Sequence, residues 1–499
     1  MTKPSQRWYR LLVGLACLVH LNYAFPTGTL RNHRIREISR RHVAPTAADD
    51  DDTATLASFL LPTGSHQPTN DTLPSRLLIH WRGEGIEGYS LQFRHWELAG
   101  ALEAVTGRDT LHALHFHDAL EYTDTADVYM SDQKRIRFNN AMQYVEIRDN
   151  DSITMSHLMR AVRRCALVHA LYLIASHGKA YEDLAEPALL NGSFDDMQVQ
   201  QSNQHAKWCI RVRQFGQDDK KGRRHGDRTR SVSAEQQAIQ ALRPVLVTFG
   251  GAVDLKHPDC KIYIFDGLKH APTVLTRRLA VGPTTSIMAP ATRICVTNTP
   301  LCPIAAYSMC NIAGIRSHQT ILDPYGGSCA ILLAAALLDK TVRTVAIDVA
   351  HNGLVNRFDI RQDFVTRQVP PPLDLLRGDC ADPTLRTLAR EVIRHQPFDH
   401  IITDPPYGIR ESSSSSTQGR TPIQELCHMI ATDRDKGTPL LRVGGKLVVF
   451  IPCRADQTLH DVMPSNAELE EAGLVPLGLR EQPLNDNLSR WLVAFQCVR

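Results

Sequence analysis

Apolar residues in the C-terminal part of the chain form short runs, separated by longer stretches with helical periodicity. The apolar runs predict strands at Thr320–Leu322, Val342–Ile347, Leu373–Arg377, His400–Thr403 and Lys446–Ile451. Helix candidates such as Ser328–Asp339 lie between these strands. Strands that alternate with helices are typical of a doubly wound parallel sheet. We therefore expect an α/β fold for residues 286–499.

Residues 76–285 show a mixed pattern. Trp208–Phe215 and Lys261–Phe265 alternate like strands, and Ala234–Leu242 has the spacing of a helix. Met155–Ser176 predicts a long helix, because its apolar residues recur at intervals of three and four. A basic insert at 217–230 is typical of a solvated loop, although such clusters also bind phosphate backbones. We expect an α+β region here.

The N-terminus has features of a targeting segment. Three basic residues precede a nine-residue apolar run at 11–19, which is shorter than the roughly 20 residues of a membrane span but suits a signal-peptide core. An Arg-rich, acid-poor stretch follows at 31–42. Residues 1–48 thus resemble the two-part presequences of complex plastids, and a plastid or mitochondrial address is one interpretation. A disordered tail is the other. Residues 49–75 predict a linker, and no stable membrane association is expected.

Composition limits the function less than the pattern does. The chain is 43% hydrophobic and 22% charged, as in ordinary soluble proteins. Its net charge of +3 is the sum of about +7 in residues 1–48 and about −4 in the remainder, so overall charge does not argue for a nucleic-acid partner. The 12 cysteines form no C-x-x-C pair, which argues against a disulfide scaffold or a zinc module. No metal site is predicted.

A glycine-containing turn follows the first predicted strand of the α/β part. Its sequence runs from Asp323 through Pro, Tyr325, Gly326 and Gly327 to the start of the helix candidate. Glycines at such a turn let a ligand approach the backbone, and the helix N-terminus directs N–H groups at it. In nucleotide-binding α/β folds the cofactor lies at this turn. Asp323, Tyr325, Gly326 and Gly327 are therefore candidate cofactor-binding residues.

Two further acids follow successive strands. Asp348 ends the second predicted strand, where an acid accepts hydrogen bonds from ribose hydroxyls, and Asp379 follows the third. Either acid alone is more often a surface or capping residue. With Asp323 they would line one edge of the sheet, which favours a nucleoside ligand.

The most specific motif is Asp404-Pro405-Pro406-Tyr407-Gly408, directly after the fourth predicted strand. It is either a rigid turn, because two prolines fix the backbone, or a catalytic site. The lone pair of an aromatic amine is delocalised into its ring, so an enzyme must hold acceptors on its N–H bonds. Asp404 and a carbonyl of the Pro405–Pro406 pair supply acceptors, and Tyr407 can stack on a base.

Asp-Pro-Pro-Tyr after the fourth strand is similar to the motif of amino-group methyltransferases that act on adenine, cytosine, guanine or glutamine. More widely, the chain from about residue 76 onward resembles the eukaryotic and archaeal tRNA guanine-10 N2-methyltransferases. The segments that carry this resemblance are FRHWELAGALEAV (93–105), VDLKHPDCKIYIF (253–265), RRLAVGP (277–283), ILDPYGGS (321–328), ITDPPYGIRE (402–411) and LREQPLNDNLSRWLVAF (479–495).

The resemblance implies a Rossmann-like class I methyltransferase domain with a C-terminal β-hairpin at 286–499, preceded by a THUMP-like tRNA-binding region within 76–285. It also implies S-adenosyl-L-methionine as cofactor, tRNA as substrate, a cytoplasmic location and, in eukaryotes, a small zinc-binding activator subunit. Two segments depart from the family. Cys329 replaces the last glycine of the usual turn, which puts close backbone approach there in doubt, and 291–311 matches loosely.

Other functions remain open at this point. A DNA or RNA adenine methyltransferase, or a protein glutamine methyltransferase, would share Asp-Pro-Pro-Tyr. A non-catalytic RNA-binding protein with a decayed methyltransferase domain is a further alternative. The RNA-binding-like region argues against the DNA and protein enzymes, and the intact Asp348, Asp379 and Asp404–Tyr407 argue against the decayed domain.

Overall fold

The computed structural model describes residues 73, 75–82, 93–110, 112–120, 141–148, 153–197, 207–215, 232–297, 300–349, 355–407, 420–485 and 487–499. The predicted presequence, the linker up to residue 72, the basic insert 217–230, Gly408 and the serine run at 412–416 lie outside the described residues. Among the described residues, no helix is both long and apolar enough to cross a membrane.

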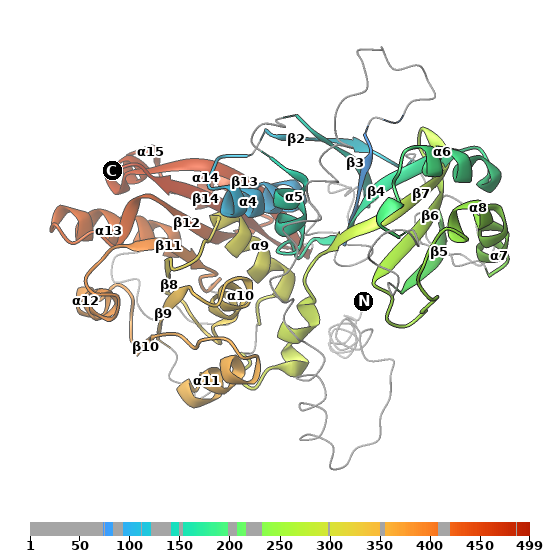
Figure 1. Ribbon diagram of the computed structural model, residues 1–499. Helices are drawn as coiled ribbons and strands as arrows, with labels where there is room; N and C mark the ends of the chain where they lie inside the picture. The colour runs from blue at the N-terminus through green and yellow to red at the C-terminus, as the bar shows by residue number, and fades with distance from the viewer. Residues whose placement is uncertain are drawn as a thin grey trace, which may run out of the picture. The chain divides into compact units, whose positions relative to one another are not determined.

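The first sheet belongs to the N-terminal half of the described chain. Its seven strands lie in the order β2-β3-β1-β4-β7-β6-β5, and every pair is antiparallel except β5 and β6 (Figure 1). The strands are β1 (Leu77–Trp81), β2 (Leu114–Asp118), β3 (Met142–Ile147), β4 (Val168–Gly178), β5 (Trp208–Gln214), β6 (Cys260–Leu268) and β7 (Ala271–Val281).

Five helices lie between the strands of this sheet in the sequence of the described residues. They are α4 (Arg94–Thr106), α5 (Met155–Val162), α6 (Ala185–Leu190), α7 (Val232–Ala241) and α8 (Arg243–Leu246), with short 3-10 turns at Tyr181–Leu184 and Asp195–Met197. The strand predictions near 208 and 261 and the helix near 234 are confirmed.

The predicted long helix Met155–Ser176 is wrong. Helix α5 ends at Val162, and strand β4 begins at Val168. The cause is burial, because β4 lies between β1 and β7 and most of its residues are buried on both faces. A strand buried on both faces is continuously apolar, so its pattern cannot be distinguished from that of a buried helix.

The second sheet carries the predicted α/β pattern. Its order is β10-β9-β8-β11-β12-β14-β13; the first five strands are parallel, and β14 and β13 form an antiparallel hairpin (Figure 1). The strands are β8 (Thr320–Asp323), β9 (Arg343–Asp348), β10 (Asp374–Arg377), β11 (Phe398–Thr403), β12 (Leu441–Arg454), β13 (Leu474–Asn485) and β14 (Leu488–Cys497). The predicted doubly wound sheet with a C-terminal hairpin is confirmed.

Helices cover both faces of this sheet, because successive residues of its strands point to opposite sides. Ile321 packs into the core that contains α9 (Pro303–Ala313), α10 (Ala330–Leu338) and α11 (Arg357–Thr366). Leu322, the next residue, packs into the core with α12 (Pro383–Val392), α13 (Pro422–Asp435) and α15 (Asn466–Ala472). The remaining short elements are α14 (Leu459–Val462) and 3-10 turns at Thr285–Met288 and Pro290–Thr292.

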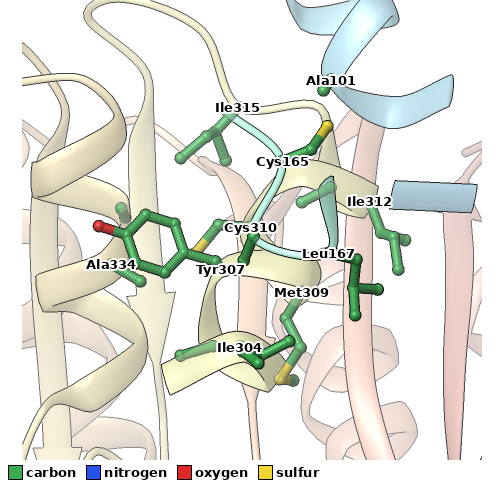
Figure 2. Packing of buried hydrophobic residues seen from close by; sticks show 14 of the residues in the cluster. Ala101, Cys165, Leu167, Ile304, Tyr307, Met309, Cys310, Ile312, Ile315 and Ala334 are labelled. Atoms are coloured by element: carbon green, nitrogen blue, oxygen red, sulfur yellow. The ribbon is translucent and has the colours of Figure 1, made fainter. Parts of the chain in front are cut away.

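Helix α4 packs directly on α9, although almost 200 residues separate them. A Cβ at Gly100 would lie 2.2 Å from the carbonyl oxygen of Asn311, so only glycine allows this approach. Figure 2 shows Ala101 of α4 near the Cys165 segment and Ile312 of α9 in one apolar cluster. The core beside the second sheet therefore continues into the N-terminal half.

A buried carboxylate joins the same elements. Glu97 of α4 is 0% exposed and accepts hydrogen bonds from the backbone N–H groups of Ala166 (2.8 Å) and Leu167 (2.9 Å). The side-chain amide of Asn311 in α9 donates a third bond, at 3.0 Å. Burial raises the pKa of Glu97 to about 7 against the opposing effect of these donors.

Candidate functional site

The glycine turn connects β8 to α10 as the sequence predicts. Gly326 donates from its N–H to the carbonyl of Ile347 at 2.9 Å, and a Cβ added to Gly326 would lie 2.8 Å from that of Ala346. Gly327 has a φ of +49°, and a Cβ there would meet only the Thr297 methyl group at 3.8 Å. The first glycine is therefore required by packing, whereas the second borders open space in which a ligand can approach the backbone.

Cys329 has a backbone conformation that glycine adopts more readily. Its φ of 58° and ψ of 36° place it in the left-handed region, which disfavours residues with a Cβ. Its N–H donates to the Gly326 carbonyl at 2.7 Å, and its thiol is buried. The residue that departs from the family sequence thus lies in a locally strained turn.

Asp348 is tied to this turn. It ends β9, and its carboxylate accepts a hydrogen bond from the Gly327 N–H at 2.6 Å. Because β9 and β8 are neighbours, the structure brings together the glycine turn and the acid predicted to hold the ribose.

Asp379 lies at the same edge of the sheet. In β10 Arg377 pairs with Asp348, and Asp379 follows two residues later. One carboxylate oxygen of Asp379 accepts from the Ala381 N–H at 2.9 Å. Tyr325 is half-buried, and burial together with the nearby Cys380 thiol, to which it is hydrogen-bonded, raises its pKa. The phenol is therefore neutral.

Asp323 links the two predicted motifs. It is buried, and the hydroxyl of Thr403, the residue before Asp404, donates to its carboxylate at 2.7 Å. The N–H of Tyr325 donates to the same oxygen at 3.2 Å. Burial raises the pKa of Asp323 to about 7, and the hydrogen bonds only partly offset this effect. Asp323 thus fixes the end of β11 against the glycine turn.

The carboxylate of Asp404 is held from two sides. The Tyr407 hydroxyl donates to its Oδ1 at 2.7 Å, and Arg490 of β14 lies 3.3 Å from its Oδ2. Arg490 also donates to the Tyr407 oxygen at 2.8 Å. The three side chains form a closed hydrogen-bonded triangle at the carboxyl end of β11.

Arg490 is itself fixed. Its Nε donates to the side-chain oxygen of Gln482 in β13 at 2.8 Å, and its guanidinium carbon lies 3.8 Å from the ring centroid of Phe450. Sequence reasoning assigned no role to Arg490 or Gln482. Arg490 lies 86 residues after Asp404, and the only signal was its position in the last segment of the family resemblance.

Burial raises the pKa of Asp404, while the Arg490 guanidinium and the Tyr407 hydroxyl oppose that rise. The Tyr407 hydroxyl has two partners, so removing it would disturb Asp404. Tyr407→Phe is therefore expected to disturb Asp404, although it keeps the ring that can stack on a base. The side chains of Asp404 and Arg490 remain 20% and 8% exposed, which leaves the acceptor open to a substrate.

These residues fit an adenosine-containing methyl donor. The open side of Gly327 admits ligand atoms, and Asp348 and Asp379 supply carboxylates at neighbouring strand ends, in the place where such folds bind nucleosides. Among the described residues, His, Cys, Asp and Glu form no group of three or more that could hold a metal ion.

Comparisons with known proteins agree with this geometry. Residues 290–369 match the model of the RMKL-like methyltransferase domain. The tRNA (guanine(10)-N(2))-methyltransferase TRMT11 of Xenopus laevis is 25% identical over 233 residues, 40% of this chain and 46% of that protein. TRMT11 of Gallus gallus is 23% identical over 381 residues, which make up 68% of this chain and 76% of that protein. The alignment with the frog protein thus spans less than half of that relative's length.

An archaeal relative and a solved structure extend the comparison. The tRNA (guanine(10)-N2)-dimethyltransferase of Methanothermobacter thermautotrophicus is 32% identical over 112 residues, 22% of this chain and 29% of that protein. The crystal structure of TrmN from Thermus thermophilus aligns with 77% of this chain and 100% of its own, at a TM-score of 0.34 and 17% identity. The chain is therefore similar to tRNA (guanine-10-N2)-methyltransferases over up to 68% of its length, and its residues 290–369 match a methyltransferase domain.

Proposed function

We propose that this chain transfers a methyl group from S-adenosyl-L-methionine to the exocyclic N2 of a guanine in tRNA, and that the guanine is at position 10. The observation that carries the proposal is the Asp404–Tyr407–Arg490 triangle beside the glycine turn. It provides a fixed acceptor for an amine next to a site for the methyl donor. The related proteins are named for this same reaction.

In the proposed reaction Asp404 accepts one N–H of the guanine amine, and the carbonyl of Pro405 accepts the other. These bonds turn the nitrogen lone pair away from the ring and toward the methyl group, which the cofactor supplies as an electrophile. Tyr407 stacks on the base. Methylation makes the nitrogen acidic, so its proton can leave afterwards, and Asp404 acts through charge and hydrogen bonding. Asp348 and Asp379 hold the nucleoside part of the cofactor.

The first sheet provides a surface that suits RNA. Lys261 of β6 lies near Arg278 of β7 and Arg211 of β5; burial and these two positive charges lower its pKa. The half-buried ring of Tyr263 is on the same strand, two residues further, and therefore on the same face of the sheet. Clustered cations beside an aromatic ring bind nucleic-acid backbones and bases. This supports a tRNA-binding role for the THUMP-like part of residues 76–285.

The decisive variant is Asp404→Asn, which keeps the shape but can present a donor where the amine needs an acceptor. We expect single-turnover methylation of a guanine-10 tRNA to fall about 10²–10³-fold, with cofactor affinity unchanged. Asp382→Asn is the matched control, since Asp382 is an exposed N-cap that asparagine replaces well. A wild-type rate in Asp404→Asn would mean that the motif is only a rigid turn.

The product identifies the substrate class. Nucleosides from tRNA methylated by the full chain should contain N2-methylguanosine or its dimethyl form, and no methylated adenine. Methylated adenine, or methylated glutamine in protein, would replace the proposal by another enzyme of the Asp-Pro-Pro-Tyr group. Cofactor binding without methylation of any substrate would favour the non-catalytic alternative.

Two further parts of the proposal come from the family resemblance. A small zinc-binding activator subunit would be a partner, and co-purification tests it. Residues 1–48 would direct an otherwise cytoplasmic enzyme to an organelle, and they lie outside the described residues. A fluorescent fusion with and without this segment tests that address.

A further inference from the structure

A cavity between α4 and β13 has no role in the reaction described above. It is lined by His95 and Trp96 of α4, by Phe116 of β2, and by Leu477 and Arg480 of β13. Its volume is about 140 Å³, roughly ten times the ~10–15 Å³ that one water needs by the same kind of measure. The cavity can therefore take a flat group of several atoms.

Aromatic rings form one wall. The rings of His95 and Phe116 are stacked, with centroids 4.1 Å apart and planes inclined by 12°. The side-chain oxygen of Gln143 fixes His95 through a 2.8 Å hydrogen bond to Nε2. Trp96 is half-buried, and a Cβ at Gly478 would lie 3.3 Å from its indole ring. Rigid flat rings of this kind bind nucleobases by stacking, whatever the base.

Arg480 adds positive charge to the lining of the cavity. Arg480 is exposed, and one of its guanidinium nitrogens donates to the carbonyl of Leu479 at 2.7 Å, which leaves further donors for a ligand. A guanidinium beside an aromatic wall suits a nucleotide, since it binds the phosphate while the rings bind the base. An uncharged apolar partner would not use this cation.

Side-chain contacts relate the cavity to the candidate active site. Arg480 and Gln482 are two residues apart in β13 and so share one face of the sheet, and Gln482 holds Arg490. Phe93, the residue before α4, has its ring centroid 6.2 Å from that of Phe450, and the Phe450 ring packs against the guanidinium of Arg490. Two independent sets of contacts thus connect the cavity with the Asp404 triangle.

We propose that this cavity binds the base and phosphate of a nucleotide adjacent to the target guanine in the tRNA. The proposal rests on the proposed function. A guanine can reach Asp404 only after it leaves the base stack, so its neighbour loses a stacking partner. The His95–Phe116 wall replaces that partner, and Arg480 neutralises the phosphate. The cavity thereby acts as a second nucleotide subsite that holds the RNA open.

The test combines protein variants with altered tRNA. Full-length wild type, His95→Ala and Arg480→Gln are compared in single-turnover methylation over a range of enzyme concentrations. The control Lys436→Gln removes one exposed positive charge at the end of α13. Each protein is assayed with an intact transcript and with two abasic transcripts. One of these lacks the base that precedes the target guanine, and the other lacks the base that follows it. Thermal melting and cofactor binding verify that the variants fold.

We expect His95→Ala and Arg480→Gln to weaken tRNA binding by about 5- to 100-fold, the range for losing one stacked base, with Lys436→Gln near wild type. One of the two abasic transcripts should bind wild type more weakly than the intact transcript does, by a similar factor. That transcript should bind His95→Ala no more weakly than the intact transcript does. If both variants match Lys436→Gln, or if neither abasic transcript affects wild type, the subsite is refuted and the proposed function stands. If wild type methylates no tRNA, both proposals fail.

Discussion

Replacing Arg490 by methionine should separate its electrostatic role from its packing role. Methionine keeps much of the length and the contact with Phe450, but it removes every hydrogen bond donor. Three bonds disappear, to Asp404 (3.3 Å), Tyr407 (2.8 Å) and Gln482 (2.8 Å). Asp404 would keep the Tyr407 hydroxyl as its partner and lose its counter-charge.

The size of the effect follows from the burial of these groups. A hydrogen bond to a charged group contributes about 1.5–3 kcal/mol, and breaking a fully buried ion pair costs about 3–5 kcal/mol. The Asp404 side chain is 20% exposed, so water partly replaces the lost partner. We therefore expect Arg490→Met to lower the free energy of unfolding by about 1–3 kcal/mol. Near neutral pH its methylation rate should fall about 10²–10³-fold.

The pH dependence distinguishes the two roles. Asp404 must be ionised to accept the amine, so the rate rises with pH through its pKa. Burial already raises that pKa, and Arg490 opposes the rise. Without Arg490 the pKa of Asp404 rises further, and the acid limb of the pH–rate profile should move to higher pH. Arg490→Lys keeps the positive charge but loses the planar guanidinium. The acid limb of its pH–rate profile should therefore lie between those of wild type and Arg490→Met.

The assay is single-turnover methylation with saturating cofactor, over about pH 5 to 9. Among the described residues, the ionisable groups that interact with Asp404 or Arg490 include Asp323, Tyr407 and Cys302, and all three are unchanged in the variant. A uniform loss of rate with an acid limb at the wild-type position would show that Arg490 only supports the hairpin. That result would refute the positioning role.

Three other predictions concern the cofactor, the turn and the buried acid. Asp348→Ala should weaken S-adenosylmethionine binding by about 1–3 kcal/mol in calorimetry, and unchanged affinity would exclude it as the ribose acid. Cys329→Gly should be more stable than Cys329→Ala by about 1 kcal/mol in urea unfolding, because only glycine relieves the φ of 58°; the reverse order would mean that the backbone relaxes. The pKa of Glu97 is raised to about 7 on folding, so the folded state binds more protons and stability should fall as pH rises from about 4.5 to 7. Glu97→Gln should make this fall of stability with pH shallower. An unchanged dependence of stability on pH would mean that other acids cause the fall.

Local patterns were sufficient to predict the second sheet. Its strands are short apolar runs that end at Asp323, Asp348 and the segment before Asp404, and each is followed by a turn with its own sequence signature. A parallel sheet brings such strand ends to one edge, so the grouping of these acids followed from topology. The roles of the individual residues in binding and catalysis stay predictions.

Residues that act over long sequence separations could not be predicted. Arg490 and Gln482 reach Asp404 because the C-terminal hairpin pairs β14 with β12, and no pattern near the motif indicates this. The same holds for Glu97, whose neighbours in the sequence identify a helix but not its partner Asn311. Continuous burial also concealed β4, since a strand that is apolar on both faces lacks the alternation that would identify it.

The contact of α4 with α9 determines how the enzyme can be divided. Glu97, Gly100 and Ala101 belong to the N-terminal half, yet they cover a face of α9 in the methyltransferase half. A chain that began at residue 286 would therefore present this apolar face to water and leave Asn311 without its carboxylate partner. A minimal catalytic fragment should need the segment that contains α4, supplied in the same chain or as a second piece. Recombination of residues 286–499 with a different N-terminal module would have to preserve this helix.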